Sequence, residues 1–114
     1  MNYFAQRLQH ETDADDVGSA LMDGSADFTL IDARSPAAYA AAHLPTAISL
    51  PHRKLTAESL PDGPLVVYCW GPGCNAAQHG ALRFARHGRA VKEMIGGWEY
   101  YARESSCDPL VGVA

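Results

Sequence analysis

Residues 65–77 read LVVYCWGPGCNAA, and the rest of the chain is organised around this stretch. It begins with a short apolar run rich in β-branched residues, which is typical of a buried strand. The glycines and proline of residues 71–73 then indicate a loop, and alanines four residues apart from Ala77 onward predict a helix. Cys69 lies where the strand ends. Backbone amides that curl around it would favour a thiolate and hold an anion against it, so the stretch predicts a reactive cysteine.

The composition is that of one globular domain. The chain has 114 residues, 47% of them hydrophobic and 19% charged, which is enough for one core and too few for two ordinary ones. A net charge of −4 without any basic run argues against nucleic-acid binding. No apolar run approaches the roughly 20 residues that span a bilayer, and the amino terminus lacks a signal-peptide pattern. We expect a single cytoplasmic domain over residues 1–114, with its core at about 12–104 and a loose tail at 105–114.

The cysteine and histidine pattern argues against a metal site. The three cysteines, at positions 69, 74 and 107, are an odd number and contain no CxxC pair, so neither a disulfide framework nor a structural zinc site is predicted. His43 has no second ligand nearby in the sequence, which favours a hydrogen-bonded structural histidine. We expect no metal and no cofactor, and Cys107 is expected to be idle in the tail.

Strand and helix patterns alternate along the chain. Strands are predicted at 28–31, 47–50, 65–68 and 90–95; helical patterns lie at 1–9, from Thr12 as a cap to Gly24, from Ser35-Pro36 to 42, at 53–60, from the cysteine loop to about 87, and at 98–103. This alternation through short loops predicts an α/β fold, a parallel sheet with helices on both faces.

Ligands of such sheets bind beyond the carboxyl ends of the strands. Asp32, Arg34 and Cys69 all fall at predicted carboxyl ends, so we expect them on one rim of the domain. Asp32 and Arg34 could form an ordinary surface ion pair, worth under about 1 kcal/mol. The preferred interpretation is that they brace the cysteine loop, with direct substrate contact less favoured.

Three segments together resemble the single-domain rhodanese family of sulfurtransferases, from about Thr12 to Glu104. The first is LIDARSPAAYAAAHLPTA at 30–47, similar to the family's D-x-R…Y…H-I-P-G-A segment; the others are VVYC at 66–69 with its loop and helix, and GGW at 96–98. The resemblance implies a three-layer sandwich with a mostly parallel sheet of about five strands. It also implies that Cys69 opens the active-site loop and carries sulfur.

The chain departs from the family pattern at several positions. The family often has Glu at position 38 and Gly at positions 42 and 46, where this chain has Ala38, Ala42 and Thr46; these look like tolerable scaffold changes. The sixth loop position often holds Arg, and here it is Cys74. The resemblance implies that such an Arg holds an anionic donor or stabilises the loop. Its absence weighs against efficient use of thiosulfate and against the related phosphatase and arsenate-reductase activities.

A sulfur-carrying cysteine must be largely ionised at neutral pH. Lowering a thiol pKa from about 8.5 to ~6.5 raises the thiolate fraction at pH 7 from ~3% to ~75%. The loop 69–75 contains no Lys, Arg or His, so backbone amides and the following helix must supply the field. The amides expected to point inward are those of Trp70, Gly71, Gly73, Cys74 and Asn75, since Pro72 has none. Gly71 and Gly73 are expected to supply positive φ angles.

The sequence leaves two interpretations open for several side chains. Cys74 is either a filler where Arg is replaced, or a partner that resolves a persulfide or forms a disulfide with Cys69. Trp70 either walls the pocket or shields the loop. Trp98, Tyr100 and Tyr101 are interpreted as packing residues rather than a binding platform.

The residues therefore predict a thiosulfate or persulfide sulfurtransferase with Cys69 as carrier. The alternatives are a redox or polysulfide-handling protein that uses the Cys69–Cys74 pair, and a non-catalytic rhodanese-like interaction module. The expected partners are a small-molecule sulfur donor and a small-molecule acceptor or protein thiol, with no nucleic acid and no membrane. A monomer or weak homodimer is expected.

Overall fold

The computed structural model describes residues 2–51, 60–71 and 73–104. The helical turn predicted at 53–60 falls almost wholly outside these ranges, as do Pro72 of the cysteine loop, Cys107 and the tail 105–114. No helix in the described part of the chain is both long and apolar enough to cross a membrane.

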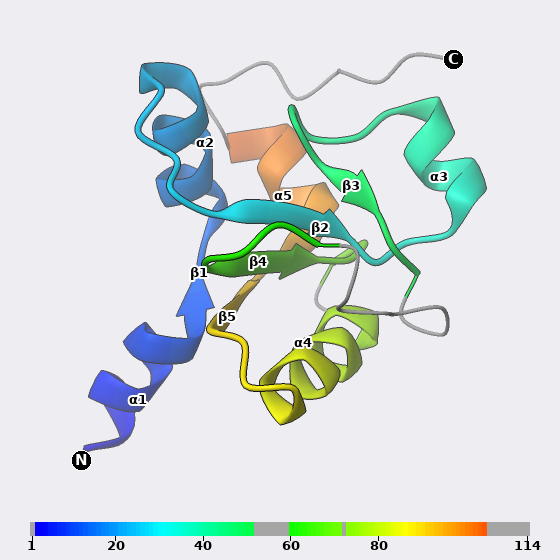
Figure 1. Ribbon diagram of the computed structural model, residues 1–114. Coiled ribbons are helices and arrows are strands. Elements are labelled where there is room, and N and C mark those ends of the chain that lie inside the picture. The colour runs from blue at the N-terminus through cyan, green and yellow to red at the C-terminus, as the bar shows by residue number, and fades with distance from the viewer. Residues whose placement is uncertain (1, 52–59, 72, 105–114) are drawn as a thin grey trace.

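Five parallel strands form the central layer (Figure 1). Their order is β1-β5-β4-β2-β3, with β4 (Leu65–Tyr68) in the middle between β2 (Thr29–Asp32) and β5 (Val91–Met94). The edges are β1 (Glu11–Thr12) and β3 (Ile48–Ser49). The α/β fold with a parallel sheet is confirmed. The sequence patterns missed β1, because two polar residues paired at an edge carry no apolar signal.

Helices cover both faces of the sheet (Figure 1). Helices α2 (Ala14–Asp23) and α5 (Gly97–Glu104) lie on one face and contact each other, and α4 (Ala76–Arg86) covers the other face. Helix α3 (Pro36–Ala41) follows β2, and α1 (Tyr3–His10) precedes β1. The three layers are those of the predicted sandwich.

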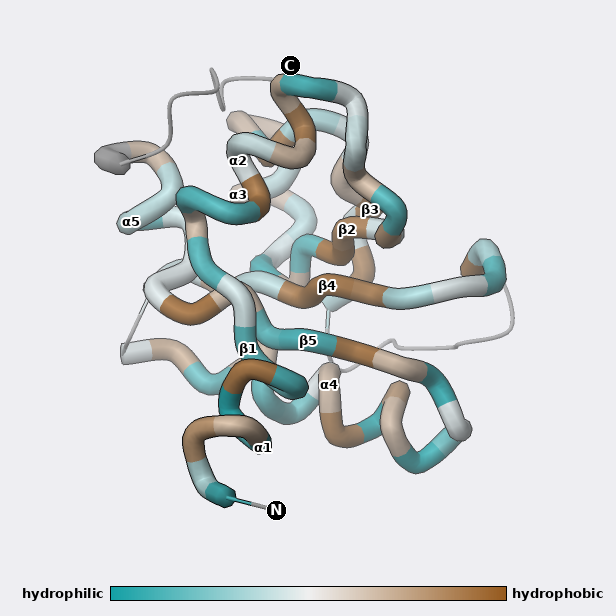
Figure 2. The backbone as a smooth tube through the Cα atoms, turned by 90° about the vertical axis from the view of Figure 1, so that its left-hand side faces the viewer, coloured by the Kyte–Doolittle hydropathy of each residue, from teal (hydrophilic) through white to brown (hydrophobic). Residues whose placement is uncertain are grey.

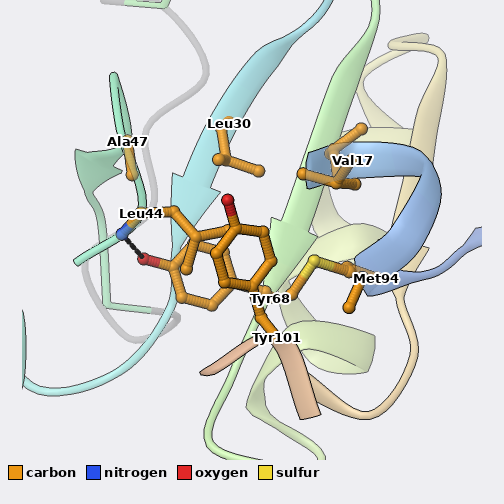
Figure 3. Packing of buried hydrophobic residues seen from close by; sticks show 9 residues of the cluster. Val17, Leu30, Leu44, Ala47, Tyr68, Met94 and Tyr101 are labelled. Carbon is orange, nitrogen blue, oxygen red and sulfur yellow. Dashed lines mark hydrogen bonds between the residues drawn. The ribbon is translucent and has the colours of Figure 1, made fainter. Parts of the chain in front are cut away.

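Alternation along the strands divides the core in two. Leu30, Val66 and Tyr68 face α2 and α5, whereas Ile31, Val67 and Cys69 face α4. All four residues of β4 are buried, while in β5 only Met94 is buried. Figure 2 shows β4 as the brown centre of the sheet. Figure 3 shows Tyr68 and Tyr101 packed among smaller apolar residues on the α2 and α5 face. Cys69 therefore emerges from the most buried strand.

Helix ends follow capping rules with one correction. Helix α2 ends at Gly24, which has a φ of 75°, and Ser35 caps α3 as predicted, its side chain accepting from the Ala38 amide. The cap of α2 is Asp13, not Thr12: the Asp13 carboxylate accepts from the Asp16 amide at 2.9 Å. Thr12 is unavailable because it pairs with β5 as part of β1.

Candidate functional site

Cys69 follows directly after β4, at the carboxyl end of the sheet. The residue is 2% exposed and packs in the α4-side core with Val67, Ala77 and Phe84. Ala77 belongs to the first turn of α4. The buried strand and the packed helix fix both ends of the loop, so the cysteine has a defined position.

Cys69 and Cys74 are joined by a disulfide bond. Their Cα atoms are 6.4 Å apart, inside the range of about 4.4–6.8 Å that a disulfide needs. Cys74 is more exposed than Cys69. Cys74 is therefore the disulfide partner of Cys69 and not merely a filler where Arg is replaced.

The loop is held by the start of α5. The Trp98 amide donates to the Cys69 carbonyl and the Glu99 amide to the Trp70 carbonyl, both at 2.8 Å. Gly97 permits this approach: its φ is 61°, and a Cβ there would lie 2.5 Å from the Cys69 oxygen. The GGW segment was one of the three segments that carry the family resemblance. Its physical role is to bring one helix end against the cysteine loop.

Two expectations about the loop backbone are wrong. Neither Gly71 nor Gly73 has a positive φ; the described glycines that do are Gly24, Gly63, Gly88, Gly96 and Gly97. The Cys74 amide donates to the Gly71 carbonyl at 3.0 Å, so it is used within the loop instead of facing an anion. Nearby, a Cβ on Gly71 would lie 2.9 Å from the Glu99 carboxylate. Gly71 is therefore needed for space more than for backbone conformation, whereas a Cβ on Gly73 would meet nothing within 4 Å.

Asp32 and Arg34 form a buried pair, so the surface-pair interpretation is wrong. The Arg34 Nη2 atom lies 2.8 Å from the Asp32 Oδ2, and their side chains are 2% and 0% exposed. Arg34 also donates to the Ala42 carbonyl at 2.6 Å. A guanidinium bonded on both sides is fixed in place.

The Arg34 guanidinium lies against two tryptophan rings. Its central carbon is 4.9 Å from the Trp70 ring centre and 4.5 Å from that of Trp98. Trp70 belongs to the cysteine loop and Trp98 to α5, so one buried cation contacts both partners of the loop anchor. Trp70 is 51% exposed. It is not among the described residues that line the pocket beside Cys69.

Tyr68 completes this network, and nothing in the sequence pattern indicated this role. Its hydroxyl donates to the Asp32 Oδ2 at 2.7 Å and accepts from the Leu44 amide at 3.2 Å, the bond dashed in Figure 3. Burial, and next the Asp32 charge, raise the pKa of Tyr68 well above its ordinary value, so it stays a neutral donor. Only the register of β2 and β4, in which Asp32 pairs with Tyr68, brings these side chains together.

A pocket of about 660 Å³ opens beside the disulfide. The loop contributes Cys69, Gly71, Gly73, Cys74 and Asn75 to its lining, and β1, β5, α4 and α5 contribute residues including Glu11, Glu93, Gln78 and Tyr100. Burial, and then the charge of Glu11, raise the pKa of the Glu93 carboxyl, while a hydrogen bond with Gln78 opposes the shift. The pocket places the Cys69–Cys74 disulfide beside an acidic wall that sequence reasoning missed.

Trp98, Tyr101 and His43 have packing roles, and Tyr100 belongs to the pocket. Tyr101 is fully buried in the core and Trp98 packs against it, as interpreted, whereas Tyr100 lines the pocket. The His43 ring stacks on Tyr39 with centres 3.7 Å apart, and its Nδ1 lies 2.9 Å from the Tyr39 carbonyl. Within residues 2–51, 60–71 and 73–104, no three potential ligands gather into a metal site.

The fold and site define a small α/β domain with a cysteine loop between the central strand and a helix. The family model of the rhodanese-like domain matches residues 13–104. The chain belongs to the rhodanese-like domain family, as the sequence resemblance predicted.

Solved structures agree with this assignment. The BH2092 protein from Bacillus halodurans is 37% identical, with a TM-score of 0.84 over 89% of this chain and 77% of that chain. The rhodanese-like domain of the Alr3790 protein from Anabaena is 26% identical, with a TM-score of 0.71 over 82% of this chain and 73% of that one.

One protein of similar fold is described with a different possible activity. A Rhodopseudomonas palustris protein described as a possible tyrosine phosphatase is 17% identical, with a TM-score of 0.70 over 87% of this chain and 83% of that one. At this identity the likeness concerns the fold alone. No protein of curated function matches the chain.

Proposed function

We propose that this protein is a sulfurtransferase that carries sulfane sulfur on Cys69. The observation that supports this best is the placement of Cys69 at the carboxyl end of β4, in a loop anchored by α5 and open to a pocket of about 660 Å³. Such a pocket holds a small sulfur donor, and the nearby start of α4 contributes a positive field.

The reaction begins from the dithiol form. Cys69 is in the disulfide, so a reductant, such as two equivalents of a thiol, first converts the pair to two thiols. The Cys69 thiolate then attacks the outer sulfur of a thiosulfate, persulfide or polysulfide donor. The bond between the outer and inner donor sulfurs breaks, and the inner sulfur leaves as an anion. A thiophilic acceptor such as cyanide or a thiol then removes the outer sulfur and regenerates the thiolate.

Intact-mass analysis tests this proposal. Reduced protein is incubated separately with thiosulfate and with a persulfide donor, desalted, and then treated with cyanide. We expect an added sulfur atom that cyanide removes as thiocyanate, and no such adduct at residue 69 in Cys69→Ser. Sulfur loading equal in the wild type and in Cys69→Ser would contradict the proposal. So would an absence of loading from both donors.

The disulfide supports a second candidate, a redox protein that handles persulfides through both cysteines. Here the Cys74 thiolate attacks the Cys69 sulfur of the persulfide, hydrosulfide leaves, and the disulfide re-forms. Two protein thiols are oxidised and the sulfane sulfur is reduced. Two equivalents of an external thiol then reduce the disulfide through a mixed disulfide with Cys74, the more exposed partner.

Cys74→Ser separates the two candidates. For a sulfurtransferase, the variant keeps a stable Cys69 persulfide and passes it to cyanide. For the redox candidate, the wild type releases hydrosulfide and re-forms the disulfide after one turnover, and Cys74→Ser releases none. Hydrosulfide release that is equal in both proteins would exclude the redox candidate.

A further inference from the structure

The pocket beside the disulfide has acidic walls. Glu11, Asp13 and Glu93 line it, and none of its described lining residues is Lys, Arg or His. Glu93 pairs in register with Glu11 on β1 and with Val67 on β4. Residues paired in register share a face of the sheet, so Glu93 lies on the same face as Val67 and Cys69.

Glu93 is near enough to Cys69 to act on a bound ligand. Neighbouring strands lie about 4.8 Å apart, and two residues advance a strand by about 6.6 Å, so their backbones are about 8 Å apart. At that distance a unit charge changes the affinity for a singly charged ligand roughly 2.4-fold in high dielectric, and more where water is excluded.

Several positive groups near the pocket offset part of the negative charge of these carboxylates, but not all of it. Arg7 pairs with Glu11 at 2.8 Å and offsets most of its charge. The start of α4 contributes about half a unit charge at most. The first amides of α5 are already bonded to the Cys69 and Trp70 carbonyls. Asp13 caps α2, so the amino end of that helix offsets part of its charge. Glu93 and the rest of the Asp13 charge remain, so the pocket has a net negative potential.

Building on the sulfurtransferase function proposed above, we propose that Glu93 determines specificity for amine-bearing thiols and persulfides over anionic ones. A cationic ammonium group beside the reacting sulfur would lie against Glu93 and Asp13. Thiosulfate, with two negative charges, would be the poorest donor. The acidic wall thus disfavours thiosulfate, as does Cys74, which stands where a cationic Arg would help to hold an anionic donor.

Thiol exchange at the disulfide tests this charge preference directly. Wild-type protein, Glu93→Gln and Asp62→Asn are reduced at about pH 8, where the carboxyl groups are ionised, with cysteamine and separately with 3-mercaptopropionate. Asp62 is the matched control, because it precedes β4 at the opposite end of the strand from Cys69. For each protein we take the ratio of the rate with cysteamine to the rate with 3-mercaptopropionate. Comparing this ratio between proteins cancels the difference in intrinsic reactivity of the two thiols.

We expect Glu93→Gln to lower the cysteamine to mercaptopropionate ratio about sixfold, one factor of roughly 2.4 for each unit of difference in ligand charge. Asp62→Asn leaves the ratio unchanged. Added salt lowers the wild-type rate with cysteamine and raises that with mercaptopropionate. A ratio unchanged in Glu93→Gln, with rates independent of salt, would overturn the proposal.

A second measurement keeps the two proposals apart. The persulfides of the same two thiols are offered to reduced protein, and loading of Cys69 is followed by intact mass. Equal loading from both persulfides refutes the charge preference and leaves the sulfurtransferase intact. Loading from neither persulfide refutes the sulfurtransferase, while thiol exchange at the disulfide still measures the charge preference.

Discussion

The backbone amide of Trp98 donates a hydrogen bond of 2.8 Å to the carbonyl oxygen of Cys69. This bond ties the first turn of α5 to the residue that follows the central strand. The chain comes this close only because residue 97 is glycine, where a Cβ would also lie 2.8 Å from the Gly71 nitrogen.

Gly97→Ala is therefore expected to displace the cysteine loop. A methyl group would meet backbone atoms that cannot move independently, and the φ of 61° is unfavourable for alanine. We expect a loss of about 2 kcal/mol or more in the free energy of unfolding, with slower sulfur loading of Cys69. Chemical denaturation measures the first effect. Gly73→Ala is the control, because its Cβ would meet nothing within 4 Å; equal losses in both variants would show that the close approach at Gly97 is unimportant.

The Arg34–Asp32 and Arg7–Glu11 ion pairs have the same 2.8 Å distance but differ in burial, so we expect different contributions to stability. Asp32→Asn leaves the buried Arg34 charge uncompensated and is expected to lower the free energy of unfolding by about 3 kcal/mol. Arg7→Gln breaks the pair with Glu11, whose side chain is 29% exposed beside that of Arg7 at 45%, and should change stability little. Thermal and urea denaturation of both variants provide the comparison. A large effect at Arg7 with none at Asp32 would reverse this assignment.

Thr46 is the one described residue other than glycine with a positive φ, at 68°. The Ala47 amide donates to the Leu44 carbonyl at 3.1 Å, so Leu44–Ala47 form a turn with Pro45 second and Thr46 third. Glycine is the preferred third residue of such a turn. We expect Thr46→Gly to stabilise the protein by about 1 kcal/mol, since a β-branched residue is strained there. Thr46→Ala should gain less, because it keeps the Cβ; a loss of stability in Thr46→Gly would refute the prediction.

The raised pKa of Glu93 implies that the free energy of unfolding depends on pH. The folded state holds this proton more tightly than the unfolded state, so the group weakens folding as pH rises through its folded-state pKa. Glu93→Gln is then expected to be more stable than the wild type at about pH 7, by less than about 1 kcal/mol because the site is half exposed. The gain should vanish near about pH 4. Urea denaturation at both pH values measures it, and a gain only at the acidic value would contradict the sign.

Local pattern and composition determined much of this protein. The alternation of apolar runs, caps and glycines placed most elements, since strand and helix periodicities are local properties of the chain. The resemblance of the Asp32, Cys69 and GGW segments placed it correctly in its family. The pairing of Cys69 with Cys74 remained one of two alternatives, because spacing alone does not give the separation of two Cα atoms.

Tertiary structure alone decided what surrounds the cysteine. Register across β1, β5 and β4 brings Glu11 and Glu93 to the face of Cys69, and register between β2 and β4 joins Asp32 to Tyr68. Burial turned Asp32 and Arg34 from an expected surface pair into a fixed support under Trp70 and Trp98. The sequence determined that Cys69 stands at the end of the central strand, because that follows from the order of elements along the chain. The charge and shape of its pocket depend on contacts between residues far apart in sequence, which only the folded sheet brings together.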